Sequence, residues 1–192
     1  MSAGSRARVT LKLATSLDGR IALANGVSQW ITGPESRAEV HRMRAAHEAI
    51  LTGIGTILAD DPQLTARPDG MANPHQPDIL IMDTAGRTPV TAAVHAEASR
   101  RVRIFRDRDL GAAMAGYASV MIEAGSAIAS AALAADLVDR IEWFRAPVVL
   151  GGDGLAAIAA LGLERLERAP TFQRVSLAEC GRDLHESYER IL

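Results

Sequence analysis

The chain has 192 residues, of which 48% are hydrophobic and 23% are charged, and its formal net charge is −2. This length suits one globular domain with its own core, and the composition excludes a disordered, collagen-like or coiled-coil protein. Because the chain has no basic excess, we expect no nucleic-acid binding, and any bound anion must be held by a local group of arginines.

The first part of the chain predicts strands and helices in turn. Apolar and polar residues alternate from Val9 to Ser16, which is typical of a strand. Thr32 and Glu35 have the spacing of a capping box around Pro34, so a helix is expected to begin there. A buried strand at 49–52 and a short helix at 53–58, ending at residues 60–62, follow.

The second part continues the alternation. The predicted elements are a surface loop at 66–77, strands at 79–83, 102–105 and 119–123, an Ala-rich helix at 126–135, a long strand at 139–150, and closing strands at 172–177 and 184–191. Strands that alternate with helices predict an α/β fold with a mixed, mostly parallel sheet and antiparallel C-terminal strands. We see no repeat and no boundary, so a single domain over 8–192 is expected.

Several absences narrow the class of protein. Cys180 is the only cysteine, which excludes an internal disulfide and favours a reducing, cytoplasmic location. The first residues form no apolar signal segment, and no stretch approaches the roughly 18 apolar residues of a membrane span. The five histidines show no metal-ligand spacing, so no metal site is expected.

Two glycine-containing turns are candidate phosphate sites. Residues 152–157 fit the dinucleotide pattern G-x-G-x-x-A, but little chain follows them, which favours a plain glycine turn over a phosphate contact. At Glu123-Ala124-Gly125-Ser126 a predicted strand passes into a helix. The free N–H groups of that helix end suit a pyrophosphate, although many α/β proteins have such a junction for structural reasons alone.

Individual side chains allow two interpretations each. Arginines at 37, 42, 44 and 67 offer planar forks that match phosphate, or they belong to exposed surfaces. Lys12, the only lysine among 21 lysines and arginines, is either an edge-strand residue or a site residue. Asp60 and Asp61 form a helix cap or exposed turn, or they belong to a site, and Trp30 either enters the core or stacks on a flat ligand.

Ordered blocks of sequence carry a specific resemblance. They are KLATSLDGR at 12–20, SQWIT at 28–32, RA at 44–45, AILTG at 49–53, Thr56, and LADDPQLTAR at 58–67, followed by EAG at 123–125, LVD at 137–139, AP at 146–147 and LGG at 150–152. Together they resemble the reductase domain of the riboflavin-biosynthesis deaminase/reductases, the RibD family, over nearly the whole chain.

The resemblance implies a dihydrofolate-reductase-like fold and a defined reaction. It implies that NADPH reduces 5-amino-6-(5-phosphoribosylamino)uracil to the ribitylamino compound, with hydride delivered to C1 of the ribose. The substrate has a phosphate at one end and a flat uracil at the other, so the protein must concentrate arginine at the site despite its net negative charge. The cofactor carries the chemistry, and the protein supplies orientation and electrostatics.

The resemblance also implies roles for individual residues. Arg44 and Arg67 would hold the substrate phosphate, with Ser28, Leu64 and Glu123 also against the substrate. The nicotinamide side would be lined by Ala14, Trp30, Thr56 and Asp60. The cofactor pyrophosphate would meet the helix start, formed by Gly125, Ser126, Ala127, Ile128, Ala129, Ser130 and Ala131. Lys12, Asp60 and Glu123 are the candidates for polarising the ribose as a general acid.

The chain departs from the family in two respects. The family often has Glu-Gly-Gly-Pro-Thr at the cofactor turn, where this chain has Glu123-Ala124-Gly125-Ser126-Ala127. The deaminase half that usually precedes the reductase is also missing from this sequence, so we expect either an isolated domain of a longer product or a separate deaminase. The family and the closing strands predict a homodimer.

Two other functions remain open. The related enzymes of archaea and fungi reduce the substrate before deamination, as 2,5-diamino-6-ribosylamino-pyrimidinone 5′-phosphate, and a reductase without a deaminase fits that order. Alternatively, the chain is a binding domain that kept the fold and lost catalysis. That function predicts the loss of polar site residues, whereas Lys12, Arg44, Asp60, Arg67 and Glu123 are all present.

Overall fold

The computed structural model describes residues 6–191 and divides into two compact units. The first unit contains the chain up to Val9 and Ala38–Glu123, and the second contains Thr10–Arg37 and Ala124–Leu192. The expectation of one domain over 8–192 stays a prediction. Within residues 6–191, no helix has the length and apolar character needed to cross a membrane.

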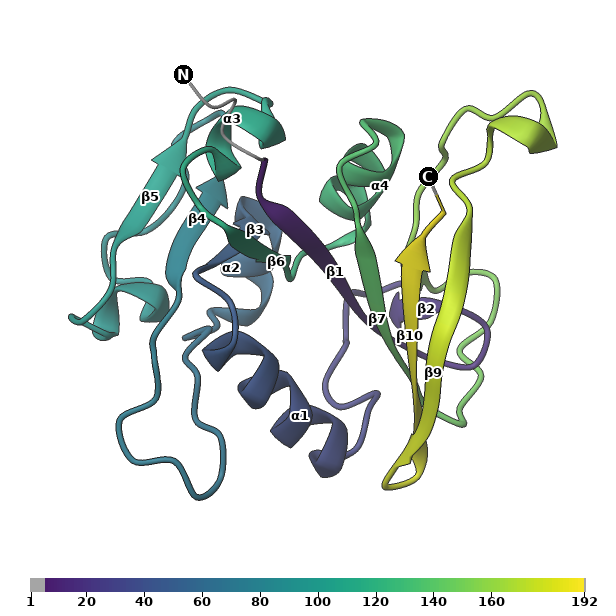
Figure 1. Cartoon of the computed structure of the whole chain (residues 1–192), viewed down its shortest axis with the longest axis horizontal. Helices are drawn as coiled ribbons and strands as arrows, with labels where there is room; N and C mark the ends of the chain where they lie inside the picture. Colours follow the sequence, from purple (N-terminus) through teal and green to yellow (C-terminus); the bar gives the residue numbers. More distant parts are fainter. Residues whose placement is uncertain (1–5, 192) are drawn as a thin grey trace. The chain divides into compact units, whose positions relative to one another are not determined.

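The first unit is built on four parallel strands, which Figure 1 shows side by side. Their order is β5 (Val102–Phe105), β4 (Asp78–Met82), β3 (Ala49–Gly53) and β6 (Ser119–Ile122). The helical elements of this unit are α2 (Ile54–Asp60), η1 (Ala93–Ala96), α3 (Leu110–Met114) and the greater part of α1 (Pro34–Ala45).

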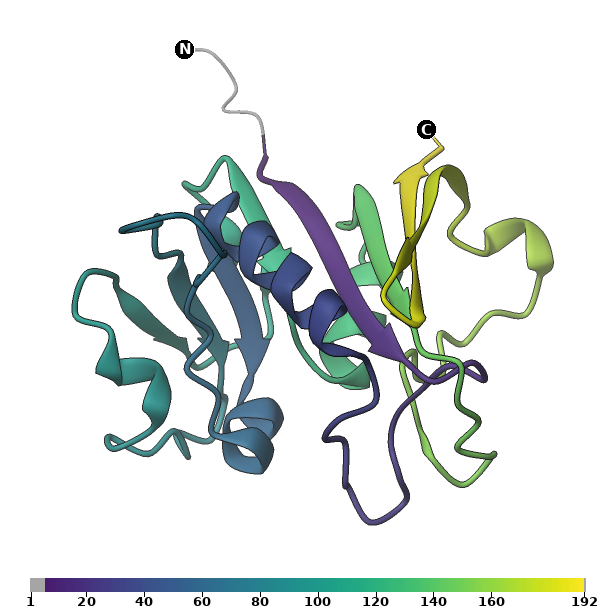
Figure 2. The same ribbon diagram turned by 90° about the horizontal axis from the view of Figure 1, so that it is seen from below.

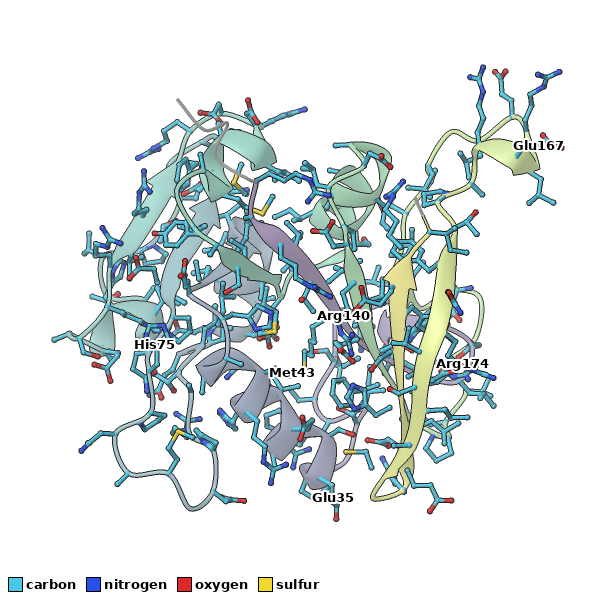
Figure 3. All side chains as sticks on the ribbon, in the orientation of Figure 1. Glu35, Met43, His75, Arg140, Glu167 and Arg174 are labelled. Carbon is cyan, nitrogen blue, oxygen red and sulfur yellow. The ribbon has the colours of Figure 1, made fainter. Side chains whose placement is uncertain are left out.

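The two inner strands, β3 and β4, are buried on both faces of the sheet. All five residues of β3 and all five of β4 are buried, which explains why their sequences are continuous apolar runs rather than alternating ones. One face packs Ile50, Ile81 and Met121 against Ile57 of α2, and Met43 of α1 packs against the same cluster. Figure 2 shows α1 running in front of these strands, and Figure 3 labels Met43 on it.

The second unit combines a parallel and an antiparallel pairing. β1 (Arg8–Thr15) runs parallel to β7 (Arg140–Arg145), and β10 (Asp183–Arg190) and β9 (Phe172–Cys180) continue the order in antiparallel fashion. The other elements are α4 (Ser126–Ala134), η2 (Leu166–Arg168) and a small sheet of β2 (Arg20–Ala22) with β8 (Leu155–Ala156). The predicted α/β class, mostly parallel with antiparallel C-terminal strands, is confirmed.

The long strand predicted at 139–150 is wrong beyond Arg145, where β7 ends. Pro147 has no N–H to donate to a ladder. The next free amides are taken by a side chain, because the Asp18 carboxylate accepts hydrogen bonds from the N–H groups of Leu150 at 3.1 Å and Gly151 at 2.8 Å. The apolar run Val148–Leu150 is therefore a loop held by the Asp18 carboxylate and not a buried strand, and Val149 is 66% exposed.

Helix α1 begins where predicted but is capped differently. The Gly33 N–H and the Ser36 hydroxyl both donate to one carboxylate oxygen of Asp183, each at 2.6 Å, and Asp183 is buried. Asp183, near the far end of the chain, therefore holds the start of α1 through the Gly33 amide and the Ser36 side chain. The turn at 152–154 leads into β8 and not into a helix, so the plain glycine turn was the correct alternative.

Candidate functional site

A buried ion pair lies at the end of the parallel strands in the first unit. Arg44, in the last turn of α1, donates from Nε to Glu123 Oε2 at 3.0 Å and from Nη2 to Glu123 Oε1 at 2.7 Å. The two side chains are only 13% and 14% exposed. Such a two-point pair fixes the guanidinium plane and the carboxylate orientation together. The structure thus brings two of the predicted substrate residues into direct contact.

Three basic side chains contact Thr65. Arg44 Nη1 donates to the Thr65 carbonyl oxygen at 3.1 Å, and His41 Nδ1 lies 3.0 Å from the same oxygen. Arg67 Nη1 donates to the Thr65 hydroxyl at 2.7 Å and to Gln63 Oε1 at 2.7 Å. The predicted pair Arg44 and Arg67 is therefore brought together through Thr65, and His41 and Thr65 are site residues that the sequence did not reveal.

The histidine in this cluster is held in its neutral form. Burial lowers the pKa of His41, and the nearby charges of Arg44 and Arg67 lower it further. The Thr65 carbonyl and the Glu123 carboxylate act in the opposite direction without reversing the shift. At neutral pH the basic cluster therefore carries its positive charge on the two arginines.

Side chains hold the segment from Asp61 to Arg67, which has no regular secondary structure. Asp61 and Leu64 both have left-handed backbone conformations, with φ of 39° and 52°. The buried Arg100 guanidinium donates to the carbonyls of Gln63, Leu64 and, at 3.0 Å, Val94. The loop is thus fixed from both sides, with Arg100 on one and the His41–Arg44 pair on the other.

The other predicted residues of the first unit differ in exposure. Leu64 is only 3% exposed and packs in the apolar core, so only its backbone is available to a ligand. Thr56 is half-buried in α2, and Asp60 is exposed at the end of that helix. Asp61 is the exposed C-cap residue of α2, and its carboxylate accepts a hydrogen bond from the Ala93 N–H at 2.8 Å, so the Asp60-Asp61 pair ends the helix.

In the second unit, Lys12 and Ala14 share one face of β1. They alternate with the buried Leu11 and Leu13, and each is half-buried. Lys12 is aligned with Glu142 of β7 in the parallel register, and Ala14 with Phe144. Side chains aligned in this way lie on the same face of the sheet. Lys12 is therefore a residue of a half-buried sheet face, and not of a solvent-facing edge.

Glu142 anchors a polar network on that face, which the sequence did not reveal. Its Oε2 accepts from Ser187 Oγ at 2.6 Å and lies 2.7 Å from His185 Nε2, and its Oε1 accepts from Arg140 Nε. Burial by itself would raise the pKa of Glu142, but these hydrogen bonds outweigh burial and lower it. The His185 ring stacks on Phe144 with 4.2 Å between centroids, so strands β7 and β10 are joined by a charged, ordered network.

Trp30 and Ser28 lie in the connection before α1. Trp30 is 66% exposed, which excludes the interpretation as a core residue, and the Arg37 guanidinium lies 4.5 Å from the ring centroid. Ser28 is half-buried. An exposed indole with a cation on one face keeps its apolar surface available for a flat ligand.

The start of α4 fits an anionic ligand. Gly125 is the N-cap and makes no side-chain capping hydrogen bond, and an added Cβ there would meet no atom within 4 Å. The N-cap residue therefore offers no side chain to the first amides of the helix, and there is open space beside Gly125. Of the seven residues predicted at this helix start, Ala129 and Ser130 are buried, and Ser130 Oγ accepts from the Ala159 N–H at 2.7 Å. The other five, residues 125–128 and Ala131, are half-buried or exposed, and their contact with a ligand stays a prediction.

Parallel strands followed by a basic cluster, and a helix start without a side-chain cap, are typical of α/β proteins that bind phosphate-bearing ligands. The chain matches the family model of the RibD C-terminal domain over residues 7–185. It therefore belongs to the RibD C-terminal domain family.

Individual proteins support the assignment. The chain is 38% identical over 178 residues to the riboflavin biosynthesis protein RibD of Mycobacterium tuberculosis, covering 92% of this chain and 52% of the relative. The structure of Acinetobacter baumannii RibD, form 1, superposes with a TM-score of 0.89 at 29% identity, covering 97% of this chain and 59% of that one.

A Thermotoga maritima structure also matches, with a TM-score of 0.81 at 28% identity, covering 97% of this chain and 57% of that one. It is described as a diaminohydroxyphosphoribosylaminopyrimidine deaminase/5-amino-6-(5-phosphoribosylamino)uracil reductase. The chain thus spans about half the length of the curated relatives it matches.

Proposed function

We propose that this protein reduces the ribosyl group of 5-amino-6-(5-phosphoribosylamino)uracil to the ribitylamino product, with NADPH as the hydride donor. The observation that carries the proposal is the basic cluster of Arg44 and Arg67 around Thr65, which suits a phosphorylated substrate. Membership of the RibD C-terminal domain family supports the reaction class.

On the substrate side, Arg67 and Arg44 bind the phosphate and Glu123 orients Arg44. The backbone of Leu64 and the side chain of Ser28 provide further polar contacts. The rigid segment 61–67 places these groups before the substrate arrives, because Arg100 and the pair His41–Arg44 already hold its carbonyl groups. Positioning of this kind lowers the entropic cost of reaching the reactive geometry.

On the cofactor side, the amides of residues 125–128 would hold the pyrophosphate, and Trp30, Ala14, Thr56 and Asp60 would line the nicotinamide. The fit is supported by the lack of a side-chain cap and by the open space above Gly125. When bound, the nicotinamide would supply a hydride to C1 of the ribose. Lys12, Asp60 and Glu123 are the candidate groups that polarise the sugar and hold the proton on its ring oxygen.

An assay of NADPH oxidation with two substrates in parallel tests the proposal. One substrate is the deaminated compound, made freshly by a separate deaminase, and the other is its 2-amino precursor. We expect oxidation only with the deaminated compound. Oxidation only with the precursor would assign the order of archaea and fungi, whereas NADPH binding without either reaction would support a non-catalytic domain. Replacing NADPH by NADH tests the cofactor preference.

We also propose that the chain forms a homodimer in the cytoplasm and works with a deaminase that is fused or separate. Strand β9 supports the dimer, because seven of its nine residues are exposed and Val175 and Leu177 are 48% and 51% exposed. Long exposed strands of this kind are commonly covered by another chain. Sedimentation equilibrium measures the mass directly, and a monomer at assay concentrations would contradict the proposal.

A further inference from the structure

His41 lies in the same cluster as the two arginines but has no assigned role. Its Nδ1 is 3.0 Å from the Thr65 carbonyl oxygen and 3.3 Å from the Arg67 backbone nitrogen. The shorter contact requires a proton on Nδ1, so the neutral ring carries its lone pair on Nε2. In that form Nε2 offers nothing to an anion, whereas protonation makes it a hydrogen-bond donor.

The charges of the three side chains that contact Thr65, together with Glu123, do not balance a phosphate monoester; the charge of Arg100, which holds the same loop, is opposed by Glu97. Arg44 and Arg67 contribute two positive charges, and the Glu123 carboxylate cancels one through its two-point contact with Arg44. A phosphate dianion added to this net single positive charge leaves one negative charge in excess. A proton on His41 would bring the occupied cluster to neutrality. Arg67 is exposed, but the Arg44 and Glu123 side chains are only 13% and 14% exposed, and charges that are largely removed from bulk solvent favour such balance.

We propose that His41 is a third phosphate-binding residue beside Arg44 and Arg67, and that it takes up a proton when the dianion binds. The inference rests on the proposed function, since it adds a residue and a proton to the substrate's phosphate site. Its consequence is that an anion that stays dianionic binds more tightly as the pH falls through the range between the pKa of His41 without the anion and its pKa with the anion.

The charged groups around His41 explain why its pKa is low without the anion and rises when the anion binds. Arg44 on the same helix and Arg67 on the facing loop disfavour its protonation, and Glu123 at the end of β6 favours it. Burial also disfavours the charged ring, so the pKa of free His41 is lowered. A dianion between the three side chains reverses the dominant charge effect and raises that pKa. Affinity then increases by about tenfold for each pKa unit that binding restores.

Sulfate is the probe, because it stays fully dianionic across this pH range, whereas a phosphate ester titrates near neutrality itself. Titration calorimetry of the whole chain, in buffers of differing ionisation enthalpy, measures proton uptake on sulfate binding. We expect uptake of a fraction of a proton near pH 6 and tighter binding at pH 6 than at pH 8. Arg67→Gln should abolish the same binding event, which assigns it to this cluster.

The matched variants are His41→Gln and His95→Gln. A glutamine at 41 retains a donor for the Thr65 carbonyl, so the loop keeps its anchor, but sulfate binding should lose both its proton uptake and its pH dependence. His95 is exposed on η1, and its variant should behave as wild type. Circular dichroism of each variant confirms that it folds.

Three outcomes would overturn the inference. The first is sulfate binding that depends on Arg67 but takes up no proton, and the second is proton uptake that survives in His41→Gln. Sulfate binding too weak to measure also counts against it. These results are separate from the proposed function, because a protein with proton-linked sulfate binding could still fail to oxidise NADPH, and a working reductase could bind sulfate without a proton.

Discussion

Arg44 and Glu123 hold each other through two hydrogen bonds, and this contact sets the geometry of the basic cluster. In Glu123→Gln, an NH2 group replaces one carboxylate oxygen and cannot accept a hydrogen bond from Arg44. The negative charge that neutralises Arg44 is lost as well. Hydrogen bonds to charged groups are each worth about 1.5–3 kcal/mol, so we expect kcat/KM to fall by tenfold or more. NADPH oxidation kinetics measure the change.

The control for this variant is Arg42→Gln, because Arg42 lies on the same helix with its side chain 55% exposed. It should change neither kcat nor KM. If Glu123→Gln kept wild-type kinetics while remaining folded, Glu123 would have no part in orienting Arg44 or in the reaction.

Asp18 gives a second prediction at the scale of one residue. Hydrogen bonds from the Ser16 hydroxyl and the Leu150 amide, with a further one from Gly151, lower the pKa of Asp18 from 3.8 to about 2. Its stabilising effect is therefore complete above pH 3.8 and is lost as the pH falls toward 2. Asp18→Asn should loosen residues 146–151 at neutral pH, seen as faster amide exchange at Leu150 and Gly151. Unchanged protection of both amides would show that the carboxylate does not pin this loop.

At the scale of elements, the loop 61–67 depends on one buried cation. Arg100 donates to three carbonyl groups, and burial lowers its pKa. In Arg100→Met those carbonyls lose their partners, and each unsatisfied group costs about 1–3 kcal/mol. We expect a lower free energy of unfolding and a raised KM for the phosphorylated substrate, with a smaller effect on kcat. Urea unfolding and steady-state kinetics measure these quantities.

Two variants separate loop positioning from general destabilisation. Arg101→Met removes the neighbouring arginine, whose side chain is 76% exposed and pairs with Asp78, and it should leave KM unchanged. Arg100→Lys keeps the charge and one donor group, so it should restore part of the affinity. A KM in Arg100→Met equal to that of wild type would refute the positioning role.

The sequence predicted elements well where the signal is local. The apolar runs of β3 and β4, the alternation of β1 and the Ala-rich helix α4 lie within a residue or two of their predicted bounds. It failed where a distant side chain decides the outcome. Asp183 binds Gly33 and Ser36 at the start of α1, and Asp18 binds the amides that follow Val149, and neither partner is near in sequence. The short elements β2, β8 and α3 have too few residues for a periodic signal.

The residues of the candidate site also fall into those that the sequence predicted and those that it missed. Arg44, Arg67 and Glu123 were named from motifs, and the structure brings them together. His41, Arg100 and the network around Glu142 were missed, because each depends on partners that only the fold brings near. For His41 the one local signal was its position three residues before Arg44, which places both side chains on one face of a helix.

At the scale of the whole molecule, acid stability follows from how the buried carboxylates are held. Burial by itself would raise the pKa values of Asp78 and Asp83, but hydrogen bonds from Arg101 and Tyr117 to Asp78, and from Thr88 to Asp83, outweigh burial and lower both. Glu142 behaves in the same way. Groups of this kind stabilise the fold above their unfolded-state pKa values, 3.8 for aspartate and 4.5 for glutamate, and this stabilisation is lost below them.

His41 adds a further step, at higher pH, to the dependence of the free energy of unfolding on pH. Its folded-state pKa lies below the ordinary 6.5, so the unfolded chain takes up a proton first as the pH falls through 6.5. We therefore expect the free energy of unfolding to be flat above about pH 7, to decline gently below 6.5 and to fall steeply below about 4.5. Urea unfolding at constant ionic strength from pH 3 to 8 measures the curve. His41→Gln should remove only the first decline, and saturating sulfate should weaken it, because the bound anion favours the protonated ring. A first decline that persists in His41→Gln would assign it to another histidine.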